Sequence, residues 1–336
     1  MDRRRLLIGA AATAAAACAP PTVSPPRGPV RPFPMRRGVN MGNALEAAYE
    51  GEWGYRIEAR HLSAIAEAGF DGIRLPVRWF EHAEDNPSYR IDPAFFARVD
   101  EVIGQALERG LKVQLDIHHF GQLIEAPRRY APRVADLWRQ IAERYREAPP
   151  DLIFEILNEL HGPYWNERRT TSLYRAAIAA IRESNPYRLI VVGPPNWNSI
   201  EGLRRWRPPQ DHNIALTFHF YNPHGLTHQD ADWLGDERPH LGRVWGEPSD
   251  VEDVQDFIAE AAELGQARGL PLQLGEFGVN KAVPVQQRAL WTRTVREACE
   301  ARGIAWCVWD FAGSFPIYDV EREAFIPEMR EALLGQ

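Results

Sequence analysis

From residue 36 onward the sequence predicts an α/β fold, a (β/α)8 barrel of the TIM type, on three observations. Strand-like apolar runs alternate with amphipathic helical segments, glycines recur where the helices end, and polar residues follow the apolar runs. Alternation of this kind favours a parallel sheet covered by helices. At 336 residues and 45% hydrophobic content, the chain is long enough to bury the core of one such barrel as a single domain.

Eight segments have the length and apolar content of buried strands. They are expected to begin at about Arg37, Gly72, Lys112, Leu152, Leu189, Ile214, Pro271 and Ile304. Amphipathic helices are expected between them, for example over Asp92–Arg109 and Val283–Arg302. In the first of these, Asp92 can cap the helix and Pro93 fits its first turn.

A short junction recurs between the predicted helices and strands. It reads Arg109-Gly110-Leu111, Arg268-Gly269-Leu270 and Arg302-Gly303-Ile304, with Ala68-Gly69-Phe70 as a looser copy. Glycine takes the left-handed conformation that ends a helix, and the apolar residue then starts the next strand. Doubly wound sheets are the alternative fold, but residues 38–43 match the glycine-rich phosphate loop of that fold poorly.

The N-terminal 18 residues resemble an export signal. Arg3-Arg4-Arg5 precede Leu6-Leu7-Ile8 and an alanine-rich run that is too short to span a membrane, a pattern similar to twin-arginine signals. Residues 15–18, Ala-Ala-Ala-Cys, also resemble a lipoprotein cleavage box with Cys18 as the lipidated residue. A plain signal peptidase site is the competing interpretation.

Residues 19–35 are rich in proline and are expected to form a disordered or extended tether before the domain at 36–336. We therefore expect that domain to be exported, whether periplasmic, secreted or anchored at the cell envelope. Membrane contact would come only through the lipid at Cys18. Of the 3 cysteines, Cys299 and Cys307 lie in the domain and are expected to be buried free thiols.

Composition excludes one class of partner and points to another. A net charge of −7 gives no concentrated basic surface for nucleic acid. The 11 tryptophans offer flat apolar faces of the kind that sugar rings contact, although core packing accounts for many of them.

Polar or aromatic side chains follow nearly every predicted strand. They are Asn43, Glu46, Arg74, His118, His119, Asn158, Glu159, His219, Tyr221, Glu276 and Trp309. In a barrel these positions meet at the C-terminal face, where active sites are assembled. Each residue alone also fits a solvated loop, an ion pair or the core, so the functional interpretation depends on their convergence.

Two apolar runs each end in one glutamate. Residues 152–159 end at Glu159, and residues 270–276 end at Glu276. Two carboxylates at two strand ends are the minimum required to cleave a glycosidic bond. A metal site at Asp116, His118 and His119 is the alternative, but adjacent strand residues point to opposite faces and seldom reach one ion.

Seven short motifs together resemble glycoside hydrolase family 5 over residues 36–336. They are Arg37–Glu46, Gly72–Pro76, Asp116–His119, Ile156–Glu159, His219–Tyr221, Gly275–Gly278 and Trp309-Asp310. The segment 221–246 is similar to the bacterial endo-β-1,4-glucanase branch, some of whose relatives also accept mannans. One departure is Leu160, which stands where the family usually has proline, so a less rigid loop is expected there.

The resemblance implies that Glu159 is the general acid/base and Glu276 the nucleophile of a retaining glycosidase. It further implies a set of substrate-binding residues and no cofactor or metal. That set is Asn43, Glu46, Arg74, His118, His119, Asn158, His219, Tyr221, His228, Trp233 and Trp309.

The expected function is therefore that of a retaining endo-β-1,4-glucanase acting, as a monomer, on β-glucan polysaccharide or oligosaccharide. Within the same family, a β-mannanase or glucomannanase and an exo-β-glucosidase remain open. Outside catalysis, the alternative is a surface carbohydrate-binding barrel.

Overall fold

The structure is a computed structural model that describes residues 30–335. The predicted signal at 1–18 and most of the predicted tether at 19–35 lie outside this range. Within the described residues, no helix combines the length and the apolar content that crossing a membrane requires.

Eight parallel strands form a closed barrel in sequence order, with β1 paired to both β2 and β8. The strands are β1 Arg37–Asn40, β2 Gly72–Leu75, β3 Lys112–Asp116, β4 Leu152–Glu155, β5 Ile190–Val192, β6 Ile214–His219, β7 Leu272–Glu276 and β8 Ala305–Val308. Each begins within one residue of its predicted start. The predicted (β/α)8 fold is confirmed.

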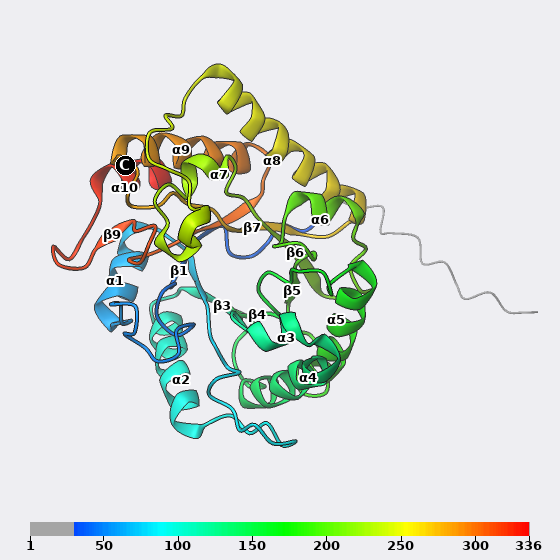
Figure 1. The fold of residues 1–336 in the computed structure, drawn as a ribbon. Coiled ribbons are helices and arrows are strands. Elements are labelled where there is room, and N and C mark those ends of the chain that lie inside the picture. The colour runs from blue at the N-terminus through cyan, green and yellow to red at the C-terminus, as the bar shows by residue number, and fades with distance from the viewer. Residues whose placement is uncertain (1–29, 336) are drawn as a thin grey trace, which may run out of the picture.

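Helices surround the strands as an outer ring (Figure 1). They are α1 Ala59–Ala68, α2 Pro93–Glu108, α3 Gly121–Glu125, α4 Pro127–Arg144, α5 Glu167–Arg182, α6 Ile200–Arg205, α7 His224–Thr227, the 3-10 helix η1 Asp232–Glu237, α8 Pro248–Arg268, α9 Val285–Ala301 and α10 Pro327–Leu334. A small hairpin of β9 Tyr318–Asp319 and β10 Ala324–Phe325 precedes α10.

The predicted helix boundaries follow from the residues identified in the sequence. The Asp92 side chain accepts a hydrogen bond from the Ala94 N–H and caps α2, with Pro93 in the first turn. Gly69, Gly110 and Gly303 have φ of +101°, +75° and +67°, the left-handed region that ends a helix at low cost. These tight turns lie at the N-terminal end of the barrel and leave the longer loops at the opposite end.

The end of the predicted tether belongs to the fold. Phe33 and Met35 are 2% and 0% exposed and pack with Ile153, Val191 and Cys307 in a cluster separate from the main core. Met35 also lies against Gly38 and Gly72 of β1 and β2, where an added Cβ would meet its side chain. An extended, solvated tether would therefore have to end before Phe33, because burying two large apolar side chains favours an ordered segment.

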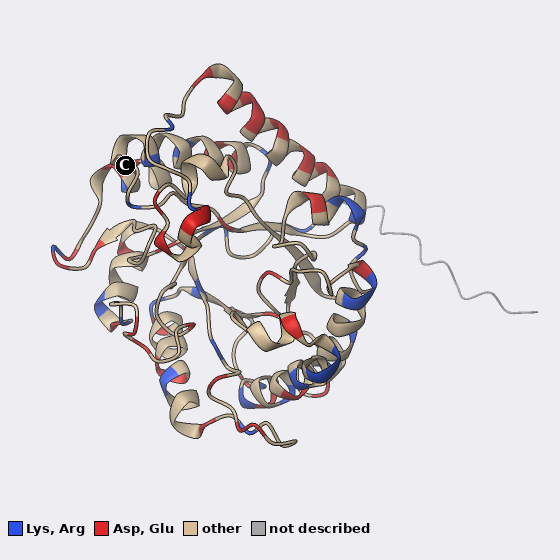
Figure 2. Cartoon of the chain, in the orientation of Figure 1, with Lys and Arg blue, Asp and Glu red and all other residues tan. Residues whose placement is uncertain are grey.

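Charged side chains lie mainly on the outer helices. Figure 2 shows acidic residues along α8 and basic residues on the helices α4 and α5. Charges of both signs are thus carried by the outer helices.

Candidate active site

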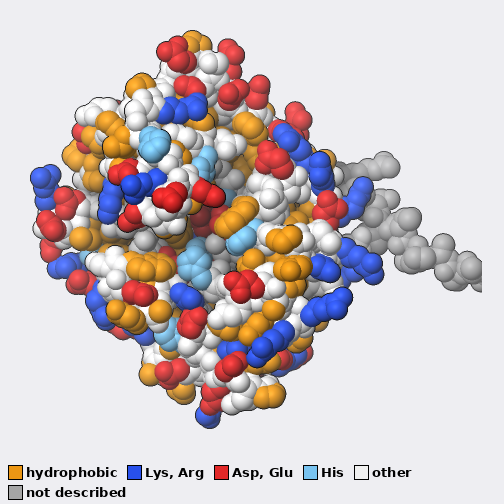
Figure 3. Space-filling model, in the orientation of Figure 1, with side chains coloured by type: hydrophobic (Ala, Val, Ile, Leu, Met, Phe, Trp, Pro, Cys, Tyr) orange, Lys and Arg blue, Asp and Glu red, His pale blue; other side chains and the backbone are white. Residues whose placement is uncertain are grey.

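A cleft of about 1450 Å³ lies over the C-terminal ends of the strands. Figure 3 shows the hollow near the centre of this face, with histidine and acidic side chains around it. Of the thirteen predicted site residues, all but Arg74 line the cleft, which brings the following together: Asn43, Glu46, His118, His119, Asn158, Glu159, His219, Tyr221, His228, Trp233, Glu276 and Trp309. Arg74 lies beneath its floor, fully buried.

Arg74, the third residue of β2, binds several polar side chains below the floor of the cleft. Its guanidinium donates to Glu276 Oε1 at 2.6 Å, to Glu155 Oε2 at 2.6 Å and to Asn158 Oδ1 at 2.9 Å, and it forms an ion pair with Asp116 at 2.8 Å. Three carboxyls therefore surround one permanent positive charge. Each buried acid is paired, as burial of charge requires.

Glu276, at the end of β7, is held by donors on both oxygens. Arg74 Nη1 donates to Oε1 at 2.6 Å and the Tyr221 hydroxyl donates to Oε2 at 3.0 Å. Burial raises the pKa of Glu276 to about 7, while His219, Arg74 and the Tyr221 hydrogen bond act in the opposite direction. Only 5% of the residue is exposed, so its orientation is fixed by these contacts.

Glu159 follows β4 on a loop and has a φ of +39°, a conformation uncommon for a residue with a side chain. Its Oε1 lies 2.6 Å from His219 Nδ1. The side chain is 21% exposed, and burial raises its pKa to about 7. It is therefore more accessible than Glu276 and has fewer donors.

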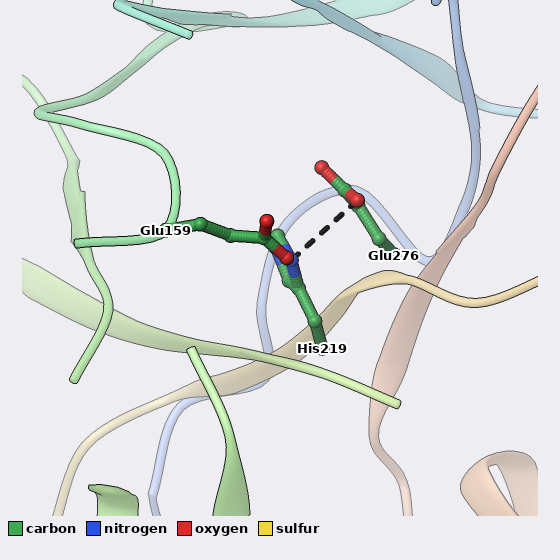
Figure 4. Close-up of side chains that lie close together, drawn as sticks. All are labelled: Glu159, His219 and Glu276. Atoms are coloured by element: carbon green, nitrogen blue, oxygen red, sulfur yellow. Dashed lines mark hydrogen bonds and ion pairs between the residues drawn. The ribbon is translucent and has the colours of Figure 1, made fainter. Parts of the chain in front are cut away.

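The two glutamates face each other across His219 (Figure 4). One oxygen of Glu159, His219 Nδ1 and one oxygen of Glu276 all lie within 4.8 Å of one another. Within residues 30–335, this is the group with metal-like spacing, rather than the Asp116, His118 and His119 group considered from the sequence. The arrangement equally suits attack on a carbon and protonation of its leaving group by two opposed carboxyls.

His118 and Trp309 form the wall beside the two glutamates. Their rings stack in parallel, with centroids 5.4 Å apart and planes at 4°. His118 Nδ1 lies 2.9 Å from Asp116 Oδ2, and its Nε2 lies 3.3 Å from Asn158 Nδ2. Gly42 keeps the other side of Trp309 free of a side chain, since an added Cβ would lie 2.8 Å from the indole.

Asn43 and Glu46 serve the loop after β1 as well as the cleft. Glu46 accepts hydrogen bonds from the backbone N–H groups of Asn43 and Ala44, and only 1% of it is exposed. The Asn43 side chain donates to Asp310, whose carboxylate also accepts from the Gly313 and Phe315 N–H groups. The Glu46 carboxylate therefore has little exposed oxygen surface for the predicted contact with a sugar. It mainly holds the backbone of the loop after β1 in place.

Three predicted binding residues lie towards the rim of the cleft. His119 is exposed beside Trp53, with ring centroids 6.1 Å apart. His228 stacks on His224 at 3.9 Å, and Trp233 on η1 is 51% exposed. These side chains present aromatic surface to the open part of the cleft rather than to the two glutamates.

The cleft also contains residues that the sequence analysis did not identify. They include Trp53, Trp197, Phe315 and Lys281. The rings of Trp197 and His161 stack at 3.4 Å, next to the Glu159 loop. Trp53 stands in the long loop between β1 and α1, where no apolar run marks its position. Trp197 lies five residues beyond the end of β5, a strand-end position that could have pointed to it.

Leu160, which follows Glu159, is held by the core and by one backbone hydrogen bond. Its side chain is fully buried, and its carbonyl oxygen accepts a hydrogen bond from the Trp197 N–H at 3.2 Å. An apolar side chain in the core thus anchors the turn at this departure from proline, and lower rigidity of the loop relative to proline stays a prediction.

Comparison with known proteins gives a consistent result. A family model described as cellulase, glycosyl hydrolase family 5, matches residues 37–314. Endoglucanase H of Acetivibrio thermocellus is 32% identical over 326 residues, covering 94% of this chain and 35% of that protein. The chain thus spans about a third of the length of that relative. Endoglucanase A of Ruminococcus albus is 30% identical over 305 residues, covering 82% of this chain and 81% of that protein.

Solved structures agree in fold over most of the chain. Cel5A of Thermotoga maritima, solved in complex with cellobiose, is 38% identical with a TM-score of 0.87, covering 89% of this chain and 97% of that one. The same Thermotoga protein has also been solved with mannotriose.

Proposed function

This chain belongs to glycoside hydrolase family 5, and from that premise we propose that it is a retaining endo-β-1,4-glucanase that cleaves internal linkages of β-glucans. The observation that carries the proposal is the geometry of the two glutamates. Their facing oxygens lie within 4.8 Å of each other, which suits retaining enzymes, whose carboxyls are about 5–5.5 Å apart, and not inverting ones at about 6.5–9.5 Å.

In the first step Glu276 attacks the anomeric carbon and forms a glycosyl ester, while the bond from that carbon to the glycosidic oxygen breaks. Arg74 and Tyr221 both donate to the Glu276 carboxylate, which keeps it ionised and aimed. Glu159 gives its proton to the departing oxygen. The partner of the Glu159 carboxyl is His219 rather than a guanidinium, and burial raises the pKa of Glu159 to about 7, so it retains a proton near neutral pH.

In the second step Glu159, now ionised, takes a proton from a water molecule that attacks the same carbon. The ester to Glu276 breaks, and the product leaves with the original configuration. His219 Nδ1, at 2.6 Å from Glu159 and 3.5 Å from Glu276, lies beside both carboxyls throughout. It orients Glu159 in each of its two protonation states.

Asn158, His118 and Trp309 would hold the sugar whose bond is cleaved. The Asn158 amide lies next to the two glutamates and suits the 2-hydroxyl, a contact that strengthens in the transition state. Trp309 supplies a flat apolar face for the ring. Asn43, His119, His228 and Trp233 would contact neighbouring sugars.

The size of the cleft supports endo action. A volume of about 1450 Å³ exceeds the roughly 300–1,000 Å³ of pockets that enclose one small ligand, so several sugar units can lie along it. Release of reducing ends from carboxymethyl cellulose and mixed-linkage glucan, with viscosity followed in parallel, tests this. Endo cleavage drops the viscosity early; an exo-β-glucosidase would release glucose with little change in viscosity.

Mannan cleavage is the second candidate activity. The Thermotoga relative solved with both cellobiose and mannotriose is 38% identical to this chain, which supports a breadth that includes mannans. Glucomannan and mannan therefore belong in the same assay panel. Activity on mannan that exceeds activity on glucan would make this chain a mannanase.

We further propose that the enzyme is exported and, through Cys18, anchored at the cell envelope, because its polymeric substrate lies outside the cell. The proposal is supported by the basic and apolar pattern of residues 1–18. A Cys18→Ser variant would move from the membrane to the soluble fraction. Unchanged fractionation would exclude the lipid anchor and leave plain secretion.

A further inference from the structure

Asp116, the last residue of β3, is fully buried below the cleft and is not part of the pair of glutamates. Its Oδ1 accepts the Val77 N–H at 3.1 Å, and its Oδ2 lies 2.9 Å from His118 Nδ1 and 2.8 Å from Arg74 Nη2. Burial raises the pKa of this carboxyl to about 8, against the lowering effects of the Arg74 guanidinium and the Val77 N–H. Both of its oxygens face groups that can only donate, the Val77 N–H at Oδ1 and the Arg74 guanidinium at Oδ2, so both oxygens act as acceptors in this arrangement.

Four residues form a closed ring at this point: Arg74, Asn158, His118 and Asp116. The guanidinium can only donate, so the oxygen of the Asn158 amide must face Arg74. The amide nitrogen then faces His118 Nε2, which must accept. The proton of His118 is thereby on Nδ1, where it donates to Asp116.

The same assignment follows from the other direction. Because Asp116 accepts, His118 Nδ1 carries the proton, Nε2 is free to accept from Asn158, and the Asn158 oxygen turns to Arg74. Burial and the neighbouring Arg74 lower the pKa of His118 well below its usual value, so the His118 imidazole stays neutral and has one defined tautomer. Arg74, which can only donate, and Asp116, which accepts, therefore both require the same orientation of the Asn158 amide.

We propose that Asp116 is a positioning residue, which fixes the tautomer of His118 and through it the direction of the Asn158 amide. The inference rests on the proposed function only in the role it gives to Asn158, whose second N–H is left for the substrate. Nothing in the ring requires Asp116 to touch the sugar.

Asp116→Asn hardly changes the volume of the side chain, but it replaces one acceptor oxygen of the four-residue ring by an NH2 donor. If the new amide oxygen faces His118, its NH2 group meets the Val77 N–H; if the amide is reversed, the NH2 group meets Arg74 and forces the other tautomer of His118. The second tautomer places an N–H against the Asn158 amide nitrogen, which cannot turn without opposing Arg74. In the first case two donors oppose each other at Val77; in the second the Asn158 amide loses its single orientation.

The direct test is NMR of the protein with 15N-labelled histidine, with the His118 signals assigned by their loss in His118→Asn. In the wild type we expect neutral His118 protonated at Nδ1, and in Asp116→Asn a change to the Nε2 tautomer or a mixture. Asp71→Asn is the matched control, since Asp71 accepts only the Arg36 and Arg37 N–H groups at the far end of the barrel. Wild-type His118 protonated at Nε2 would overturn the proposal.

Kinetics then separate positioning from a general structural effect. Asp116→Asn should lower kcat roughly 10- to 100-fold with a small change in KM, the range seen when outer partners of catalytic groups are removed. In an Asn158→Ala background the same substitution should have little further effect. An equal loss in both backgrounds would mean that Asp116 only supports the fold. Because the tautomer is read without turnover, failure of the proposed activity would remain distinguishable from failure of this inference.

Discussion

The surroundings of the two glutamates differ more than their residue type suggests. Glu276 ends a barrel strand, is 5% exposed and accepts hydrogen bonds from Arg74 and Tyr221. Glu159 stands on a loop with a left-handed backbone, its side chain is 21% exposed, and it has one close partner, His219. The first site favours a fixed negative charge, whereas the second allows a proton to come and go.

This difference, rather than the pKa of either residue alone, separates the two roles. Burial raises the pKa of both to about 7, and groups so close titrate as a pair. What decides which carboxyl holds the charge is the number of donors. The hydrogen bonds from Arg74 and Tyr221 stabilise the ionised form of Glu276 more than the single contact with His219 stabilises that of Glu159.

The largest effect is expected from Glu276→Gln, which removes the charge and keeps the shape. We expect kcat to fall by about 10⁴-fold or more, since the amide cannot attack the anomeric carbon. Initial rates on carboxymethyl cellulose measure the loss, and oligosaccharide binding by calorimetry checks that the cleft is intact. Substantial residual hydrolysis would mean that Glu276 is not the nucleophile.

Glu159→Ala should reduce activity less, and unequally among substrates. With aryl glycosides whose leaving group needs no proton, the first step should stay fast, while with polysaccharide the rate should fall roughly 10²- to 10⁴-fold. Azide, which attacks the glycosyl ester without a general base, should restore turnover of the aryl substrates. Equal losses on good and poor leaving groups would argue against an acid role for Glu159.

Tyr221→Phe tests the difference in donors directly. The hydroxyl stabilises ionised Glu276, so its removal raises the pKa of that carboxyl. The nucleophile must be ionised, and activity is lost as the pH falls through its pKa; the acidic limb of kcat/KM should therefore move to higher pH. The pH profile of kcat/KM measures this. An unchanged acidic limb would show that Arg74 alone holds the charge.

The smallest effect is expected at the rim, where Trp233→Ala removes an exposed aromatic face and leaves both glutamates untouched. KM for cello-oligosaccharides should rise roughly two- to tenfold, the value of one aromatic contact of about 0.5–1.5 kcal/mol, with kcat nearly unchanged. Tyr187→Ala is the matched control, since Tyr187 is 82% exposed and lies outside the cleft. A large fall in kcat would mean that the rim also orders the catalytic residues.

The barrel could be predicted from the sequence because each strand–helix unit depends on the same two local requirements. An apolar run of three to six residues must be buried, and a glycine after several of the helices permits the left-handed turn into the next strand, as at Gly110 and Gly303. The predicted residues at strand ends meet in one cleft for the same reason. Their position follows from the strand and needs no knowledge of the loops.

What the sequence did not reveal depends on contacts between distant segments. Trp53 reaches the cleft only through the path of the long loop between β1 and α1. Glu155 lies inside an apolar run, Ile153-Phe154-Glu155-Ile156, and a charged residue at that place was a signal that it points into the barrel. Asp116 was considered only as a metal ligand, because its pairing with Arg74 and His118 requires β2 and β3 to be placed side by side.

In the proposed mechanism Glu276 forms the glycosyl ester and Glu159 does not. The most direct measurement is mass spectrometry of the peptides released after incubation with a dinitrophenyl 2-deoxy-2-fluoro-β-cellobioside. The fluorine slows breakdown of the ester, and the good leaving group still allows it to form. We expect one label, on the peptide that contains Glu276. A label on Glu159, or hydrolysis with inverted configuration and no label, would contradict it.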